Sequence, residues 1–96
     1  MFQLNNEGRL KAWRDFRAEL NSLELEKALT QTAEFWARAP FEPFYLDIDA
    51  VENWPNPWEL VEENVYCDLA KCLGIVYTLL LTRHGSDLDF EIRVYN

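Results

Sequence analysis

All four prolines of this 96-residue chain lie in one block, Ala39 to Ala70, and this block also accounts for the whole net charge of −8. Proline ends or begins a regular element rather than continuing it, so Pro40 is expected to end one helix and Pro57 to begin another. The block has no Lys or Arg, and its eight carboxylates are Glu42, Asp47, Asp49, Glu52, Glu59, Glu62, Glu63 and Asp68. The flanking arms are balanced in charge. A patterned negative potential repels phosphate and attracts basic protein surfaces, so we expect a protein partner with a basic surface and no direct binding of nucleic acid.

The N-terminal arm has the pattern of two helices. The first begins at Asn5 or Asn6, either of which can cap free N–H groups, and has apolar residues at helical spacing up to Leu20. The second is expected from Leu23 to Ala39, after a break at Asn21-Ser22. Two helices joined by a tight turn predict a helical hairpin.

A third helix is expected to begin at Pro57, with Asn56 as its N-cap, and to continue to Leu81 as the long central helix of the core. Its candidate break points are residues 64–67 and Gly74. Gly85 is placed to end it in the left-handed conformation, and the lone histidine, His84, is expected to cap it rather than to catalyse a reaction.

Two segments alternate between apolar and polar residues, which is typical of half-buried strands. They are residues 41–49 and residues 87–95. The sequence therefore predicts a single α+β domain over residues 1–96, in which an N-terminal helical hairpin and the long apolar helix accompany a small antiparallel sheet of two or three strands.

Pairing of these strands would bring their carboxylates together, namely Asp47, Asp49, Asp89 and Glu91. Clustered carboxylates are what a Mg²⁺ site for phosphoryl chemistry requires, so a metal-dependent nuclease or phosphatase is one alternative function. However, the same residues are also the solvent side of ordinary strands, and no Lys or His is placed to activate water. We therefore expect no catalytic residues, no bound metal and no cofactor.

The leading hypothesis is a non-catalytic interaction protein that binds through the acidic, Trp- and Pro-rich block and also self-associates. The chain has 15% aromatic residues, and aromatic residues are enriched in interfaces, although they could equally fill the core. The expected partner-binding residues are Glu52, Trp54, Trp58, Glu59, Glu62 and Glu63. A further alternative is a DNA mimic that occupies the basic groove of a DNA-binding protein.

The remaining charged and thiol side chains suggest structural roles. Arg9, Lys11, Arg14 and Arg17 form the basic cluster of the first helix, which is expected to be solvated or to meet the acidic block of a neighbouring copy. Cys67 and Cys72 are expected to be buried free thiols. No apolar run is long enough to span a membrane, and no signal segment is evident, which predicts a soluble cytoplasmic protein.

The tract Trp54-Pro55-Asn56-Pro57-Trp58-Glu59-Leu60, with the Leu-rich segment that follows it, resembles small uncharacterised proteins of tailed bacteriophages. The resemblance covers about the middle third of the chain and contains no catalytic motif. It implies a phage gene product, acting in the host cytoplasm or in the virion as an assembly component or as a regulator of a larger protein.

Overall fold

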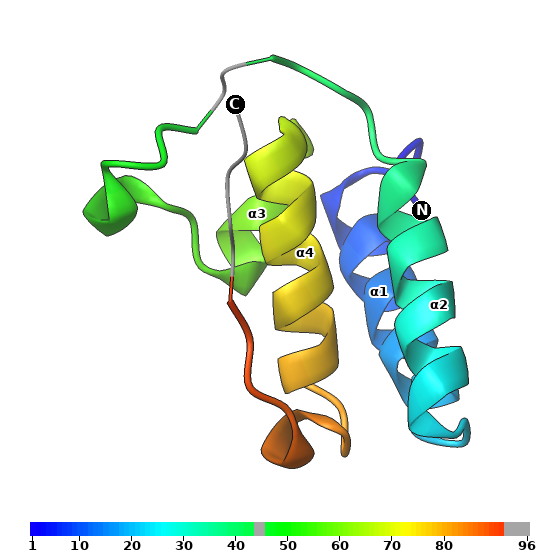
Figure 1. Ribbon diagram of the computed structural model, residues 1–96. Coiled ribbons are helices and arrows are strands. Elements are labelled where there is room, and N and C mark those ends of the chain that lie inside the picture. Colours follow the sequence, from blue (N-terminus) through cyan, green and yellow to red (C-terminus); the bar gives the residue numbers. More distant parts are fainter. Residues whose placement is uncertain (44–45, 92–96) are drawn as a thin grey trace.

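The computed structural model describes residues 1–43 and 46–91, and in this part of the chain it is all-helical (Figure 1). Four α-helices and two short 3₁₀ turns follow one another. Their bounds are α1 Asn6–Leu20, α2 Leu25–Ala37, η1 Val51–Asn53, α3 Pro57–Glu63, α4 Asp68–Leu80 and η2 Gly85–Asp87.

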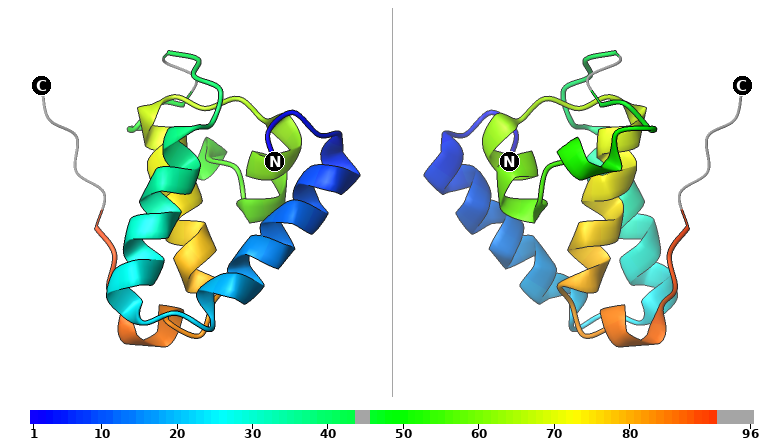
Figure 2. Two further views of the ribbon diagram at one scale, coloured as in Figure 1. Left: turned by 90° about the vertical axis from the view of Figure 1, so that its right-hand side faces the viewer. Right: turned by 90° about the vertical axis from the view of Figure 1, so that its left-hand side faces the viewer.

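The helices are arranged as two packed pairs. α2 and α4 lie side by side, and α1 packs mainly against the short α3. α1 and α2 are joined by a tight turn at residues 21–24 but then diverge, so that the two form a V when seen from the side (Figure 2). The predicted hairpin therefore has the expected connection, but its two helices pack chiefly against other elements.

The predicted sheet is wrong. Among the described residues the only β-type pairing is one isolated parallel bridge between Phe41 and Tyr66. The segment predicted as the second strand begins in η2 and continues without regular structure through Glu91. Residues 44–45 and 92–96 of the two predicted strands lie outside the described residues. The fold class is thus all-α rather than α+β.

The apolar residues of these segments are partly buried even without a sheet. Leu46 packs against the helical core, and Leu88 and Phe90 are half-buried. Alternation requires only that every second side chain be covered, and a helical surface can cover it as well as a second strand can.

The helix starts follow their local capping chemistry closely. The Asn5 side chain accepts a hydrogen bond from the Gly8 backbone N–H at 2.9 Å. Asn56 and Glu59 form a reciprocal capping box around Pro57, with N···O distances of 3.0 and 2.8 Å. Both caps confirm the sequence prediction.

The long helix is divided at the first of its two candidate break points. Asn64 adopts the left-handed conformation with φ of 53°, and its side-chain Nδ2 donates to the Phe2 carbonyl at 2.9 Å. Asparagine tolerates this region better than most residues, which explains the stop. Gly74, the other candidate, stays helical.

Two other predicted helix ends are displaced. α2 begins at Leu25 rather than Leu23 and ends at Ala37 rather than Ala39. The Ser22 hydroxyl donates to the Glu19 carbonyl at 2.7 Å and does not cap α2. Gly85 begins η2 and has no positive φ. It is needed for close packing instead, since an added Cβ would lie 2.6 Å from the Leu80 carbonyl oxygen.

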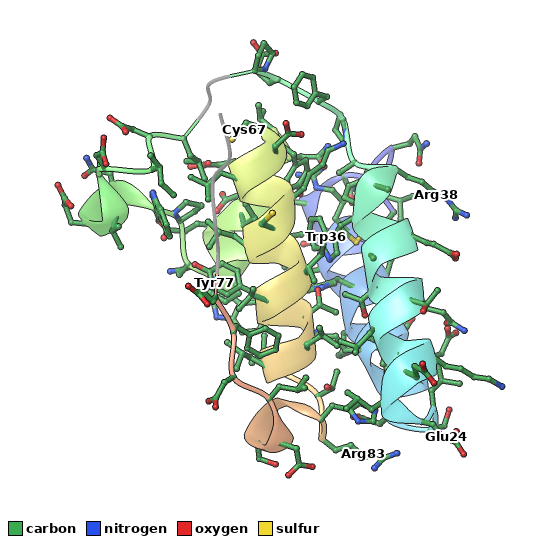
Figure 3. All side chains as sticks on the ribbon, viewed as in Figure 1. Glu24, Trp36, Arg38, Cys67, Tyr77 and Arg83 are labelled. Atoms are coloured by element: carbon green, nitrogen blue, oxygen red, sulfur yellow. The ribbon has the colours of Figure 1, made fainter. Side chains whose placement is uncertain are left out.

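The core is centred on one hydroxyl group. The indole N–H groups of Trp13 and Trp36 both donate to Thr78 Oγ1, at 3.0 and 2.8 Å. Thr78 in turn donates to the Gly74 carbonyl at 2.6 Å, so its single donor and both acceptor positions are used. Trp36, which points from α2 towards α4 in Figure 3, lies directly on Gly74, where an added Cβ would come within 2.5 Å of the ring.

Thr78→Val is expected to lower the free energy of unfolding by about 2–5 kcal/mol, because it leaves two buried indole N–H groups without an acceptor. Urea denaturation followed by Trp fluorescence measures this change. Thr32→Val is the matched control, since Thr32 is equally buried on the neighbouring helix but bonds only to the Ala28 carbonyl. Its cost should stay near ~1 kcal/mol or below, and equal costs for the two variants would refute the role of Thr78.

Candidate interaction surface

Every carboxylate-bearing residue of the acidic block is solvent-exposed. The structure nevertheless divides most of these residues between two regions. Glu59, Glu62 and Glu63 lie on α3, which is packed against α1, whereas Glu42, Asp47, Asp49 and Glu52 lie on the segment that connects α2 to α3. That segment crosses the top of the molecule and projects beyond α3 on the side away from α1 and α2 (Figure 1).

The α3 region lies beside arginines of the N-terminal arm. Arg9 Nε donates to the Val61 carbonyl at 3.0 Å, and its Nη2 donates to the Glu62 carbonyl at 2.9 Å. These are carbonyls of the last turn of α3, where a cation is favoured by the helix dipole. The prediction that the basic cluster is merely a solvated face is therefore wrong for Arg9, whereas its contact with a neighbouring copy stays a prediction.

A second arginine is held between aromatic rings of α1 and α3. Arg17 Cζ lies 4.3 Å from the ring centroid of Trp13 and 5.6 Å from that of Trp58. Burial, and then the nearby Arg14, lower the pKa of the Arg17 guanidinium. The two indoles pack edge to face at 5.5 Å, with Trp13 buried and Trp58 half exposed. Trp58 thus belongs to the α1–α3 contact and is still half exposed.

Residues 47–55 of the connecting segment are held by hydrogen bonds, although they contain no long element. Asp47 Oδ1 accepts the Asp49 backbone N–H at 2.9 Å, which forms a tight Asx-type turn. The Trp54 indole N–H donates to the Asp47 carbonyl at 2.7 Å and closes the loop across seven residues. At its end, the Tyr77 hydroxyl donates to the Pro55 carbonyl at 2.7 Å and attaches the loop to α4.

Exposed apolar residues alternate with the acids along this loop. Phe41, Ile48 and Val51 are 56%, 37% and 58% exposed, respectively. We call the described part of this segment the acidic loop, defined as Phe41, Glu42 and residues 46–54. An exposed surface that mixes carboxylates with large apolar groups is suited to a partner with both basic and apolar contacts.

The predicted partner-binding residues fall into different roles. Glu52 is exposed in η1, and the carboxylates of Glu62 and Glu63 are exposed on α3. Trp54 is half-buried and holds the loop together, and Glu59 belongs to the α3 capping box. The sequence did not predict that Phe41, Ile48 and Val51 are exposed. Ile48 was expected on the apolar face of a strand, and Phe41 and Val51 were given no role.

The carboxylates proposed for a metal site do not form one. That hypothesis required paired strands, and the described parts of those two segments do not pair. Within residues 1–43 and 46–91, no group of three or more His, Cys, Asp or Glu side chains is arranged to hold a metal ion.

His84 and Arg83 make structural contacts at the end of α1. His84 is buried and its Nε2 lies 3.1 Å from the Leu20 carbonyl, so it caps the C-terminal end of α1 and not the helix that precedes it. Arg83, labelled in Figure 3, binds the neighbouring Asn21 and Leu23 carbonyls. Cys67 is buried as predicted, whereas Cys72 is exposed.

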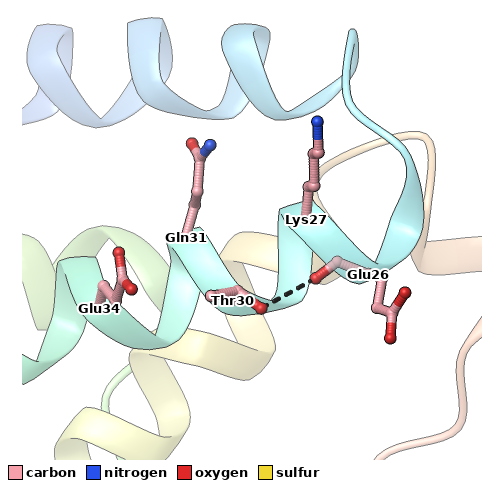
Figure 4. A pocket seen from close by; sticks show the side chains of 5 residues that line it. All are labelled: Glu26, Lys27, Thr30, Gln31 and Glu34. Carbon is pink, nitrogen blue, oxygen red and sulfur yellow. Dashed lines mark hydrogen bonds between the residues drawn. The ribbon is translucent and has the colours of Figure 1, made fainter.

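A shallow depression on α2 is open to solvent, and the polar side chains that line it do not point towards a common centre. It is lined by Glu26, Lys27, Thr30, Gln31 and Glu34, all from one helix. In Figure 4, Lys27 and Gln31 point towards α1, whereas Glu26 and Glu34 point in other directions. Such an arrangement does not enclose a ligand.

No protein-family model matches this sequence, and comparisons with curated proteins and with solved structures likewise give no match. Within the described residues, no helix combines the length and the apolar character that crossing a bilayer requires.

The tyrosine that attaches the acidic loop should make stability depend on alkaline pH. Burial, followed by the nearby Glu59, raises the pKa of Tyr77 above its ordinary value of 10.0. The folded state therefore retains this proton where the unfolded chain loses it, so the stabilisation is complete below about pH 10 and declines above it. Tyr77→Phe should show a smaller loss of unfolding free energy between about pH 8 and 11 in urea titrations. An unchanged pH slope in that variant would contradict the assignment.

Proposed function

We propose that this protein is a non-catalytic interaction protein that binds a basic, partly apolar protein surface through the acidic loop. The observation that carries the proposal is the pattern on that loop. Four exposed acids, Glu42, Asp47, Asp49 and Glu52, are interspersed with three exposed apolar side chains on a projecting, internally hydrogen-bonded segment.

The electrostatic argument favours the loop over α3. The α3 carboxylates share their surroundings with Arg9 and Arg17, whose charges reduce the local negative potential. Residues 46–54 of the acidic loop include no Lys or Arg, and Lys71 lies beside the other end of the loop, with its Nζ 5.6 Å from the Phe41 ring centroid. A negative surface of this kind raises the association rate of a basic partner, and this effect weakens as salt is added.

The apolar members supply a second kind of contact. Val51 and Phe41 are more than half exposed, and covering them removes apolar area from water. The loop is fixed in shape by the Asp47 turn and by the hydrogen bonds of Trp54 and Tyr77, so binding needs to order few residues. Charge and apolar area together favour a folded protein partner over a simple cation.

The resemblance of the Trp/Pro tract to small phage proteins suggests the biological setting. In that setting the protein would act as an assembly component or as a regulator of a larger protein. Both roles need a docking surface and neither needs a catalytic centre.

A charge-removal variant tests the proposal directly. The substitutions Glu42→Gln, Asp47→Asn, Asp49→Asn and Glu52→Gln remove four charges, and the amide introduced at position 47 keeps a side-chain oxygen that can accept the Asp49 backbone N–H. Tagged protein is used to capture partners from phage-infected and uninfected bacterial lysates, with quantification by mass spectrometry. We expect recovery of the specific partner to fall at least about tenfold, and wild-type recovery to decrease with increasing salt.

The matched control removes the same number of charges elsewhere, through Glu7→Gln, Glu19→Gln, Glu24→Gln and Glu34→Gln. These residues are exposed and lie outside the acidic loop. The control should recover partners as well as the wild type does. Equal recovery by both variants, or a greater loss in the control, would overturn the assignment of the docking surface.

A further inference from the structure

Arg17 is a half-buried cation without a counter-charge. Its guanidinium lies between the rings of Trp13 and Trp58, 4.3 and 5.6 Å from their centroids. Its Nε is shielded from solvent, yet within residues 1–43 and 46–91 this nitrogen has no hydrogen-bond partner and no carboxylate pairs with the side chain. A charged group that is partly withdrawn from water without a partner is destabilised, so a carboxylate brought to its open side would stabilise it.

The arginines that bind neighbouring backbone are satisfied in a way that Arg17 is not. Arg9 donates to two carbonyls at the end of α3, and Arg83 donates to two carbonyls just after α1. Arg17 is held by aromatic rings instead, and stacking on a ring uses none of its N–H donors. Because the rings already fix its position, the guanidinium loses little conformational entropy when it pairs with a carboxylate.

Arg14 and Trp58 extend this site into a surface. Arg14 is exposed and lies three residues before Arg17, so the two guanidiniums occupy adjacent positions on α1. Trp58 is 50% exposed beside Arg17. We call Arg14, Arg17 and Trp58 the Arg–Trp surface. Arginine and tryptophan are the residues that most often dominate binding energy in interfaces, and here they favour a segment with both acidic and apolar side chains.

The acids near the Arg–Trp surface leave its two guanidiniums unpaired. Asp15 pairs with Lys11 at 3.3 Å, and the Glu59 carboxylate accepts the Asn56 backbone N–H in the capping box of α3. Glu62, one turn after Trp58, is exposed and forms no ion pair within the described part of the chain. An acid from another molecule would therefore displace no existing ion pair.

The acidic loop of a second copy has the matching chemistry. It interleaves four exposed acids with the exposed aliphatic side chains of Ile48 and Val51. Its carboxylates suit the guanidiniums, and its aliphatic groups suit the half-exposed indole of Trp58. Within one molecule the loop projects beyond α3 on the side away from α1, so it does not reach the arginines of its own α1 (Figure 1).

From this complementarity we propose that the acidic loop of one copy docks on the Arg–Trp surface of another copy. The contact joins two different surfaces, so each pair of copies keeps one free loop and one free Arg–Trp surface, and copies add in series into a ring or a filament. The inference names the partner of the acidic loop and therefore rests on the proposed function.

Mixing two variants tests the contact. The surface variant carries Arg14→Gln and Arg17→Gln, and the loop variant carries Glu42→Gln, Asp47→Asn, Asp49→Asn and Glu52→Gln. In sedimentation equilibrium the wild type should self-associate, and each variant alone should do so at least about tenfold more weakly. An equimolar mixture should form a heterodimer, because the surface variant supplies an intact loop and the loop variant supplies an intact Arg–Trp surface.

Controls separate the contact from folding and from net charge. Arg17→Gln also removes the stacking on Trp13, so circular dichroism and thermal melts establish that each variant is folded. Arg14→Gln alone, at an exposed position, should weaken self-association about threefold without changing the melting temperature. Lys27→Gln with Arg38→Gln removes two exposed cations of other elements, and this control should self-associate like the wild type.

Three results would overturn the inference. These are a wild type that stays monomeric up to about 1 mM, self-association that the surface variant retains, and a mixture that associates no better than the separate variants. Its failure can be distinguished from failure of the proposed function. A monomeric wild type whose acidic loop still captures a different protein from lysates would leave the proposed function in place and reject only the second copy as partner.

Discussion

The hydroxyl of Thr78 holds three of the four helices in their relative positions. It accepts hydrogen bonds from Trp13 of α1 and Trp36 of α2 while belonging to α4 itself. A buried indole N–H without an acceptor is costly, so each Trp can adopt its position only if this oxygen is present. Gly74, one turn earlier, provides the space in which the Trp36 ring reaches that oxygen. Two residues on one helix therefore determine where two other helices can lie.

The divergence of α1 from α2 follows from this arrangement. α2 lies close to α4 because Trp36 packs on Gly74, whereas α1 packs mainly on α3. α1 also contacts α4 through the Trp13 indole and α2 through the stacked rings of Phe16 and Phe35. Side chains from elsewhere in the chain then satisfy the free carbonyls. Arg9 caps the end of α3, and Arg83 and His84 cap the end of α1. From composition alone, Arg9, Arg83 and His84 would be counted as side chains that are free to bind a partner.

The N-terminal ends of α1 and α3 could be predicted because their capping signals are local. Asn5, Asn56 and Pro57 act within one turn of their own position, and their effects appeared as expected. The sheet was predicted wrongly because alternation reports only that every second residue is covered, and does not identify what covers it. The hydrogen bonds of Arg9 with α3 join residues more than 50 positions apart, which no local pattern reports. For the candidate site, exposure of the acids was correctly expected, but their division between α3 and the acidic loop was not.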